Sequence, residues 1–247
     1  MRFILVVLAA LWLAPAARAA GAPDAFTPAQ RAEIVAILRQ ALVADPTILR
    51  DAVAALQDSE AAHQKAAAQS AITRAGPALT DAAPGAVAGN PHGDVTVVEF
   101  YDLRCPYCRH MVPEIAALLH QDANIRLIYQ DIPILGPGSV LGARAVLAAA
   151  RQDGYARLQS AIMQGSAQIT EASLHEMAQQ TGLDWERLQR DMQDPAIAAR
   201  IRSNLDLAHQ LDIEGTPAFV IGTQMIPGAV ELTELQQAVA AARAAPH

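Results

Sequence analysis

The chemistry of this chain is most readily assigned to its two cysteines, Cys105 and Cys108, which lie three positions apart in 247 residues. A disulfide that closes so short a loop removes little entropy from the unfolded chain, so it stabilises a fold very little. Secreted scaffolds held together by disulfides carry several well-separated pairs instead. The pair is therefore predicted to be a reactive dithiol, which forms and breaks disulfides with other molecules.

Disulfide exchange needs one accessible thiolate and a second thiol that can attack the mixed disulfide. Cys105 is predicted to lie at the start of a helix, where unpaired N–H groups and the helix dipole favour its thiolate. Pro106 suits the first helical turn, and Arg104 adds positive charge. These features predict a pKa for Cys105 below the free value of about 8.5. Cys108 is predicted to lie one turn further on, on the same face and more buried.

A metal site is the main alternative interpretation of the two cysteines. A structural zinc ion needs four ligands, and the chain offers only this pair with scattered histidines such as His92 and His110. Two soft thiolates could still bind Cu(I), with Cys105 and Cys108 as its ligands. The sequence predicts no other metal site and no cofactor.

The elements predicted around the dithiol form a recognisable order. A strand at 95–101, a helix from Cys105 to about His120 and a strand at 125–129 come first. Helices follow over 140–211, then short strands at 218–221 and 224–226 and a helix at 233–244. Strand–helix–strand followed by strand–strand–helix is the βαβ…ββα order of the thioredoxin fold. The prediction is thus an α/β domain over 94–247, with an inserted helical domain at about 139–211.

The first residues predict export from the cytoplasm. Arg2, an apolar run over 3–13 that is too short to span a bilayer, and a small-x-small pattern at 17–19 are typical of a signal peptide over 1–19. A membrane anchor or a buried first helix is the alternative. Removing Arg2 and Arg18 would change the net charge from −7 to −9. Such a charge argues against nucleic acid as a partner.

Residues 20–75 are predicted to be an N-terminal helical segment. Thr27 and Pro28 form a helix start, and Gln30 completes a capping box. Apolar residues then recur at helical spacing in two stripes: Ile34, Ile37, Leu38 and Leu42, then Ile48, Leu49, Val53 and Leu56. These stripes could pair with other copies of the chain or pack on the chain's own catalytic domain. Residues 76–93, which are punctuated by glycine and proline, are predicted to be a linker.

The segment VVEFYD at 97–102, followed by Cys-Pro-Tyr-Cys, resembles the active-site segment of DsbA-like thioredoxin-fold proteins. Thr216-Pro217 before the strand at 218–221 resembles the cis-proline loop of that family. The Gly-Thr-Pro spelling and the helical N-terminal segment point to bacterial periplasmic proteins of the suppressor-of-copper-sensitivity (ScsC) type. The resemblance covers residue 95 to the C-terminus well and residues 27–75 more loosely.

The resemblance implies a role for five residues. Cys105 would be the nucleophile and Cys108 the resolving thiol. Pro217 would be cis and place the backbone of Thr216 beside the sulfurs to pair with a substrate strand, although an ordinary strand-edge proline is the alternative. Glu99 would be a buried acid that relays protons to Cys108, the alternative being a solvent-facing strand position.

Three functions follow as hypotheses. The first is a periplasmic disulfide isomerase or reductase that acts on exported proteins with cysteines and is recycled by a membrane redox partner. The second is a monomeric dithiol oxidase, and the third is a Cu(I)-binding copper-tolerance protein. The N-terminal segment favours the first, because the resembled proteins oligomerise through it. A homo-oligomer through residues 27–75 is therefore expected.

Overall fold

The computed structural model describes residues 26–165 and 168–245, so the predicted signal peptide lies outside the described residues. The chain divides into two compact units, one up to Asp58 (unit 1) and one from Ser59 (unit 2). None of the helices in the described ranges is both long and apolar enough to cross a membrane.

Unit 1 consists of α1 (Pro28–Ala44) and the first part of α2 (Thr47–Ala75). The predicted capping box is confirmed, because the Thr27 hydroxyl accepts a hydrogen bond from the Gln30 N–H and the Gln30 side chain accepts one from the Thr27 N–H. Asp45 accepts hydrogen bonds from the backbone and hydroxyl of Thr47 and so starts α2. α1 therefore begins where the sequence predicted.

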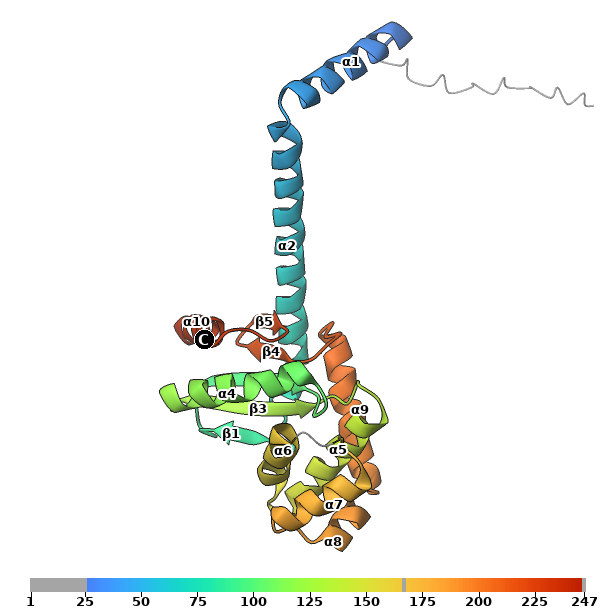
Figure 1. Ribbon diagram of the computed structural model, residues 1–247. Helices are drawn as coiled ribbons and strands as arrows, with labels where there is room; N and C mark the ends of the chain where they lie inside the picture. Colours follow the sequence, from blue (N-terminus) through green and yellow to red (C-terminus); the bar gives the residue numbers. More distant parts are fainter. Residues whose placement is uncertain (1–25, 166–167, 246–247) are drawn as a thin grey trace, which may run out of the picture. The chain divides into compact units, whose positions relative to one another are not determined.

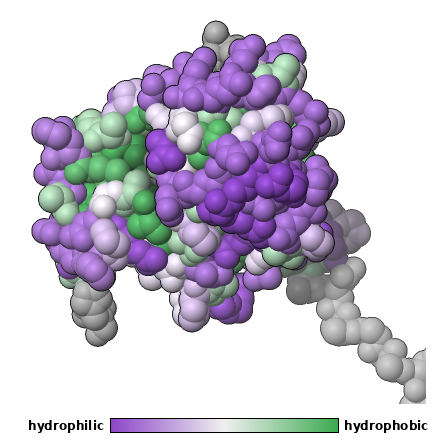
Figure 2. Space-filling view, turned by 90° about the horizontal axis from the view of Figure 1, so that it is seen from below, coloured by the Kyte–Doolittle hydropathy of each residue, from purple (hydrophilic) through white to green (hydrophobic). Residues whose placement is uncertain are grey.

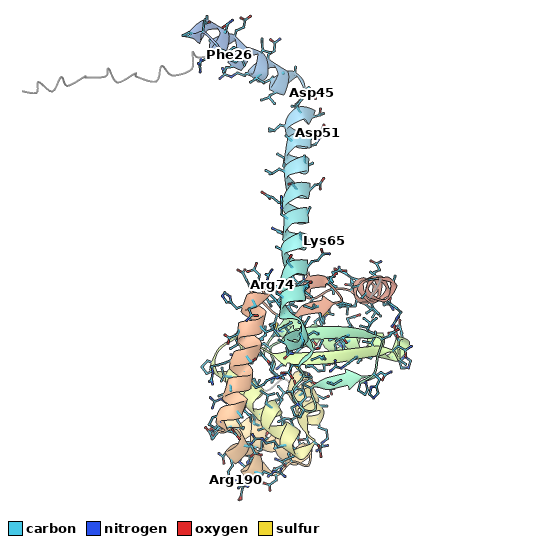
Figure 3. The ribbon with its side chains drawn as sticks, turned by 180° about the vertical axis from the view of Figure 1, so that it is seen from behind. Phe26, Asp45, Asp51, Lys65, Arg74 and Arg190 are labelled. Carbon is cyan, nitrogen blue, oxygen red and sulfur yellow. The ribbon has the colours of Figure 1, made fainter. Side chains whose placement is uncertain are left out.

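The apolar side chains of unit 1 are exposed. No residue of α1 is buried. Ten large apolar side chains on the helices of unit 1 are exposed: Ile34, Val35, Ile37, Leu38, Leu42, Val43, Ile48, Leu49, Val53 and Leu56. Figure 3 shows the side chains between Phe26 and Asp51 projecting outward from their helices. The part of unit 1 that the structure describes thus has no core of its own.

Unit 2 is built on a five-stranded sheet in the order β1-β3-β2-β4-β5. Its strands are β1 (Val87–Gly89), β2 (Val95–Tyr101), β3 (Ile125–Asp131), β4 (Ala218–Ile221) and β5 (Gln224–Pro227). The central pair β2 and β3 is parallel, and the other pairs are antiparallel. β4 and β5 are joined by a two-residue turn, in which Gly222 has φ 60°.

Helices cover both faces of the sheet. Successive side chains of β2 point to opposite faces, and both sets are mainly apolar, so each face needs a covering layer. One face packs Val97 and Leu127 against α4 (Pro106–Gln121) and α10 (Leu232–Ala244). The other face packs Val98 and Phe100 against the end of α2, α3 (Pro77–Thr80) and the end of α9 (Pro195–Gln210). The sheet is therefore a buried central layer.

The helical insertion lies between β3 and β4. It contains α5 (Pro137–Ala149), η1 (Ala150–Gln152), α6 (Tyr155–Gln164), α7 (Glu171–Gln180), α8 (Trp185–Asp191) and α9. Figure 1 shows these helices gathered at one side of the sheet. Figure 2 views the side where α7 and α8 lie. Its surface is mainly hydrophilic, with an apolar area between hydrophilic residues. The predicted thioredoxin fold with an inserted helical domain is confirmed.

Two features differ from the sequence analysis. Residues 76–93 were expected to form an irregular linker, but they contain α3 and β1, and β1 pairs with β3 as an edge strand. Only three residues pair, which is too short for an alternating pattern to be visible among the glycines and prolines. In addition, the two units divide inside α2, because Ile72 and Ala75 are buried in the core of unit 2.

Candidate active site

The dithiol lies where β2 ends and α4 begins. Asp102, which is buried, follows β2 and accepts hydrogen bonds from the N–H groups of Arg104 (2.8 Å), Ile134 (2.9 Å) and Leu135 (3.0 Å). One carboxylate therefore ties the loop before Cys105 to the loop after β3. The sequence analysis did not single out Asp102, because two of its partners lie 32 and 33 residues away in the second loop.

Cys105 occupies the N-cap position of α4, and its side chain makes no capping hydrogen bond. Its thiol donates a hydrogen bond to the Thr216 carbonyl oxygen at 3.1 Å. The side chain is only 3% exposed, so it is more enclosed than predicted. The Arg104 guanidinium donates to the Leu135 carbonyl at 2.5 Å. The sulfur therefore lies at the N-terminal end of a helix, against the loop that the sequence predicted to bind substrate.

Cys108 lies inside the first turn of α4 and is 0% exposed. Burial raises the pKa of its thiol well above the usual range, and the charge of Glu99 raises it further. A thiol in this environment stays protonated unless a nearby group accepts its proton. Both cysteines are free thiols.

The loop before β4 faces Cys105. The Thr216–Pro217 peptide bond is cis, as the resemblance implied. The Pro217 carbonyl accepts a hydrogen bond from Gly228 N–H at 2.8 Å, and Ala218 then pairs with Phe100 of β2. The pairing of β4 with β2 thus brings Thr216 next to a cysteine 111 positions earlier.

Glu99 is buried in the middle of β2 at 1% exposure, so the alternative of a solvent-facing position is wrong. Its pKa is raised to about 8 because burial disfavours the charged form. Within the described residues its Oε2 atom has no hydrogen-bond partner. An unpaired buried carboxyl is costly, and such groups concentrate at functional sites.

A second buried acid, Asp131, was missed by the sequence analysis. Its two carboxylate oxygens accept hydrogen bonds from the hydroxyls of Tyr101 (2.7 Å) and Tyr155 (2.8 Å). Burial raises its pKa to about 6, although both hydrogen bonds act in the opposite direction. The available signal was that Tyr101 and Asp131 end two adjacent strands, but Tyr155 comes from the insertion and could not be foreseen.

Exposed apolar side chains lie on α4 beside Cys105 in sequence, on the loop that Asp102 and Arg104 bind, and at the start of α5. Among the described residues of unit 2, four large apolar side chains are exposed: Tyr107, Ile134, Leu135 and Val140. We call these four residues the apolar rim. Tyr107 lies between the cysteines in sequence. Ile134 and Leu135 are held beside Cys105 through Asp102 and Arg104, and Val140 follows in α5. The rim provides apolar surface where another polypeptide would approach the sulfur.

The cysteines are not part of a larger metal-binding cluster. Residues 26–165 and 168–245 contain no group of three or more His, Cys, Asp or Glu side chains that could hold a metal ion.

Comparison with known proteins agrees with this geometry. Residues 96–240 match the family described as DSBA-like thioredoxin domain, and residues 30–63 match the copper resistance protein ScsC N-terminal domain. A thioredoxin-like oxidoreductase from Silicibacter pomeroyi is 47% identical, with a TM-score of 0.64, over 66% of this chain and 95% of that one. Proteus mirabilis ScsC in a transitional conformation is 28% identical, with a TM-score of 0.64, over 89% and 99%.

A curated relative shares only part of its length with this chain. The Na(+)/H(+) antiporter NhaA 3 of Salinispora tropica is 28% identical over 158 residues, which are 63% of this chain and 24% of that protein. The chain therefore spans about a quarter of that relative.

Proposed function

The chain belongs to the DSBA-like thioredoxin family of thiol–disulfide oxidoreductases, and from this premise we propose that Cys105 and Cys108 exchange disulfides with exported proteins in the periplasm. The observation that carries the proposal is the asymmetry of the two thiols. Cys105 lies at a helix N-terminus against the Thr216 carbonyl, whereas Cys108 is fully buried near Glu99, whose Oε2 atom has no hydrogen-bond partner among the described residues.

In the reductive direction, the Cys105 thiolate attacks one sulfur of a substrate disulfide. A Cys105–substrate disulfide forms, and the other substrate sulfur leaves as a thiolate that takes a proton from water. Cys108 then gives its proton to Glu99 and attacks the Cys105 sulfur. The Cys105–Cys108 disulfide forms, the second substrate sulfur leaves as a thiolate, and two electrons have passed to the substrate.

Glu99 is suited to the proton step because its pKa of about 8 lies near neutral pH. A group that titrates near the working pH can both take and return a proton. The same carboxyl would protonate the Cys108 thiolate when the reaction runs in the oxidative direction. The buried, unpaired position of Glu99 then has a chemical task.

The substrate is proposed to be an extended, partly unfolded polypeptide. The backbone of Thr216 would pair with its main chain, and the apolar rim would contact side chains that are buried once folding is complete. Main-chain pairing gives affinity with little sequence selectivity. Exported proteins with unpaired or mispaired cysteines fit this description.

Isomerase or reductase activity is proposed over simple oxidation because of unit 1. The ten large apolar side chains exposed on its helices need a partner, and a second copy of the same helices supplies a matching surface. An oligomer would hold several dithiols near one substrate, which favours repeated exchange. A membrane redox protein that returns electrons to the dithiol belongs to the same proposal.

The assignment of the two thiols can be tested by limiting alkylation. The reduced protein is treated with substoichiometric iodoacetamide, and the labelled peptide is identified by mass spectrometry. We expect Cys105 to be labelled first, and reduced Cys108→Ser to accumulate mixed disulfides with an unfolded substrate that carries a disulfide. Preferential labelling of Cys108 would reverse the two roles.

Copper binding is a second candidate, favoured by the match of residues 30–63 to a copper resistance protein domain. Cu(I) would use the two thiols of Cys105 and Cys108, because soft ligands suit this ion. Titration of the reduced protein with Cu(I) against a chromogenic chelator tests the idea. Binding that survives in Cys105→Ser would contradict it.

A further inference from the structure

The loop between β3 and α5 has a fixed backbone but exposed side chains. One carboxylate oxygen of Asp102 accepts hydrogen bonds from the N–H groups of Ile134 (2.9 Å) and Leu135 (3.0 Å). The Leu135 carbonyl accepts a bond from the Arg104 guanidinium at 2.5 Å. Ile134 and Leu135 are nevertheless each 42% exposed. The loop therefore presents two aliphatic side chains from a backbone that is held through both its N–H groups and its carbonyl.

Asp102 holds the cysteine-bearing segment as well as the loop. Its other carboxylate oxygen accepts the Arg104 N–H at 2.8 Å, and its backbone carbonyl accepts the Cys105 N–H at 3.0 Å. Asp102 is buried, so the bonds to its carboxylate form away from water and are of the strong, charge-assisted kind. One residue thus fixes the loop at 134–135 relative to the backbone of Cys105.

Arg104 lies against two glycines at the start of α5. A Cβ atom added at Gly138 would be 3.0 Å from Arg104 Cδ and 3.4 Å from its Nε, and one added at Gly136 would be 3.7 Å from its Nη1. Gly136 also has φ 99°, which residues other than glycine rarely adopt. These two positions leave room for the guanidinium to reach the Leu135 carbonyl. The guanidinium is therefore directed to the loop, whereas the sequence analysis considered only its charge beside Cys105.

A loop that is already ordered binds an apolar side chain at a lower entropic cost than a mobile loop. Ordering a flexible backbone and its side chains opposes binding, and a preorganised surface avoids that cost. Aliphatic area that is in water before binding also gains free energy when it is covered. The bonds of Asp102 and Arg104 therefore make the loop a preformed site for an aliphatic side chain.

We propose that Asp102 and Arg104 are positioning residues that set substrate selectivity, because they hold the loop at 134–135 so that the protein prefers cysteines flanked by apolar residues. The proposal rests on the proposed function, in which Cys105 attacks a substrate disulfide and the apolar rim contacts the substrate. It adds the class of sequence that is favoured and two residues that create the preference without taking part in the bond exchange. Apolar segments are mostly buried in folded proteins, so this preference directs the dithiol to unfolded chains.

The test compares two substrates on one protein. Reduced full-length protein is mixed with symmetrical peptide disulfides whose cysteine is flanked by leucine or by serine, and formation of the Cys105–Cys108 disulfide is followed by acid quenching and mass spectrometry. Each reaction converts one peptide disulfide to two peptide thiols. The selectivity is the ratio of the two second-order rate constants, leucine over serine, divided by the same ratio for dithiothreitol. We expect a wild-type selectivity of about five, because covering part of an aliphatic side chain strengthens binding by that factor.

Substitutions at the two positioning residues should lower the selectivity. Asp102→Asn loses an acceptor for the three N–H groups, and Arg104→Met keeps the stem but has no donor for the Leu135 carbonyl, so both should bring the selectivity close to one. Arg104→Lys, which keeps a donor, should be intermediate. Gly138→Ala displaces Arg104 from a different element and should also lower the selectivity. Asp131→Asn is the matched control and should keep the wild-type value, because Asp131 is a buried acid that accepts hydroxyls and not the loop N–H groups.

Amide hydrogen exchange measured by NMR gives a second readout that does not depend on activity. The N–H groups of Ile134 and Leu135 should exchange about tenfold faster in Asp102→Asn than in the wild type, while those of β2 and β3 stay protected and show that the variant is folded. Arg104→Met replaces an exposed residue and decides the question if Asp102→Asn does not fold. Wild-type selectivity in Arg104→Met, or a wild type with no preference for leucine, overturns the inference and leaves the proposed function standing. Consumption of peptide disulfide that persists in Cys105→Ser overturns the proposed function itself.

Discussion

Unit 1 leaves ten large apolar side chains exposed on its helices, whereas unit 2 buries the carboxyl of Glu99 at 1% exposure, with no partner for Oε2 in the part of the chain that the structure describes. Each arrangement costs stability in the isolated chain, because the first keeps apolar surface in water and the second keeps an acid out of it. The difference shows what each region lacks. Unit 1 needs another surface to cover it, and Glu99 needs a proton to exchange.

The largest effect is expected at the dithiol of unit 2. Cys105→Ser should reduce disulfide exchange by more than about a thousandfold, because no other nucleophile replaces the attacking thiolate. The loss should be the same in the full chain and in a chain that begins at Ser59, if chemistry belongs to unit 2 alone. Reduction of insulin disulfides, followed by turbidity, measures it. Residual activity that depends on unit 1 would break the comparison.

The next effect tests whether unit 1 is covered by a second copy. A chain that begins at Ser59 keeps Ile72 and Ala75, which belong to the core of unit 2, and should remain folded. We expect it to be monomeric by light scattering and to refold scrambled ribonuclease about tenfold more slowly, since linked sites raise the effective concentration of dithiols.

Point variants provide a control for that truncation. In the full-length protein, Ile37→Asp with Leu49→Asp should also give a monomer, because both side chains belong to the exposed apolar set. Dithiol oxidation of a reduced peptide, which needs only one site, should change little. A wild-type mature protein that is already monomeric would favour the oxidase interpretation over the isomerase.

Stability should respond to Glu99 in a pH-dependent way. Its pKa is raised from 4.5 to about 8 on folding. The stability linked to this group is therefore fully present below about pH 4.5 and is lost as the pH rises through about 8. At pH 9 the wild type should be less stable than Glu99→Gln by at most about 5 kcal/mol, and at pH 5 the two should differ little.

Urea denaturation of the reduced proteins at both pH values measures this difference. Equal destabilisation of Glu99→Gln at pH 5 and pH 9 would show that the residue acts through packing and not through its charge. Asp131, whose pKa is raised to about 6, remains in both proteins and so cancels from the comparison.

The sequence was sufficient for the parts that depend on local pattern. The helix start at Thr27 and the placement of Cys105 at the start of a helix both follow from residues within four positions of each other. The thioredoxin order of elements came from the same short-range signals. These interactions form between neighbours, so spacing alone reveals them.

The remainder depends on contacts between distant segments. β1 is recognised only by its pairing with β3, and Asp102 only by the N–H groups of a loop that is 32 residues away. Tyr129 faces Glu99 because two strands are in register. No local pattern specifies that register. Burial of Glu99 was expected from the resemblance, but the lack of a partner for its oxygen appears only when every neighbour is placed.

The smallest effect separates the exposed apolar side chains of unit 2 from those of unit 1. If the apolar rim contacts substrate, Leu135→Ser should raise KM for a reduced, unfolded protein about fivefold. The reason is that losing part of the leucine area that substrate would cover costs roughly 1 kcal/mol of binding free energy. Turnover of glutathione should be unchanged, because a small thiol does not reach the rim. Leu135→Ile keeps the apolar area and serves as the control.

The oligomeric state of Leu135→Ser should be unaffected, whereas the Ile37→Asp, Leu49→Asp variant should show the reverse pattern. A change in both properties on substitution of Leu135 would mean that the rim is also covered by a second copy.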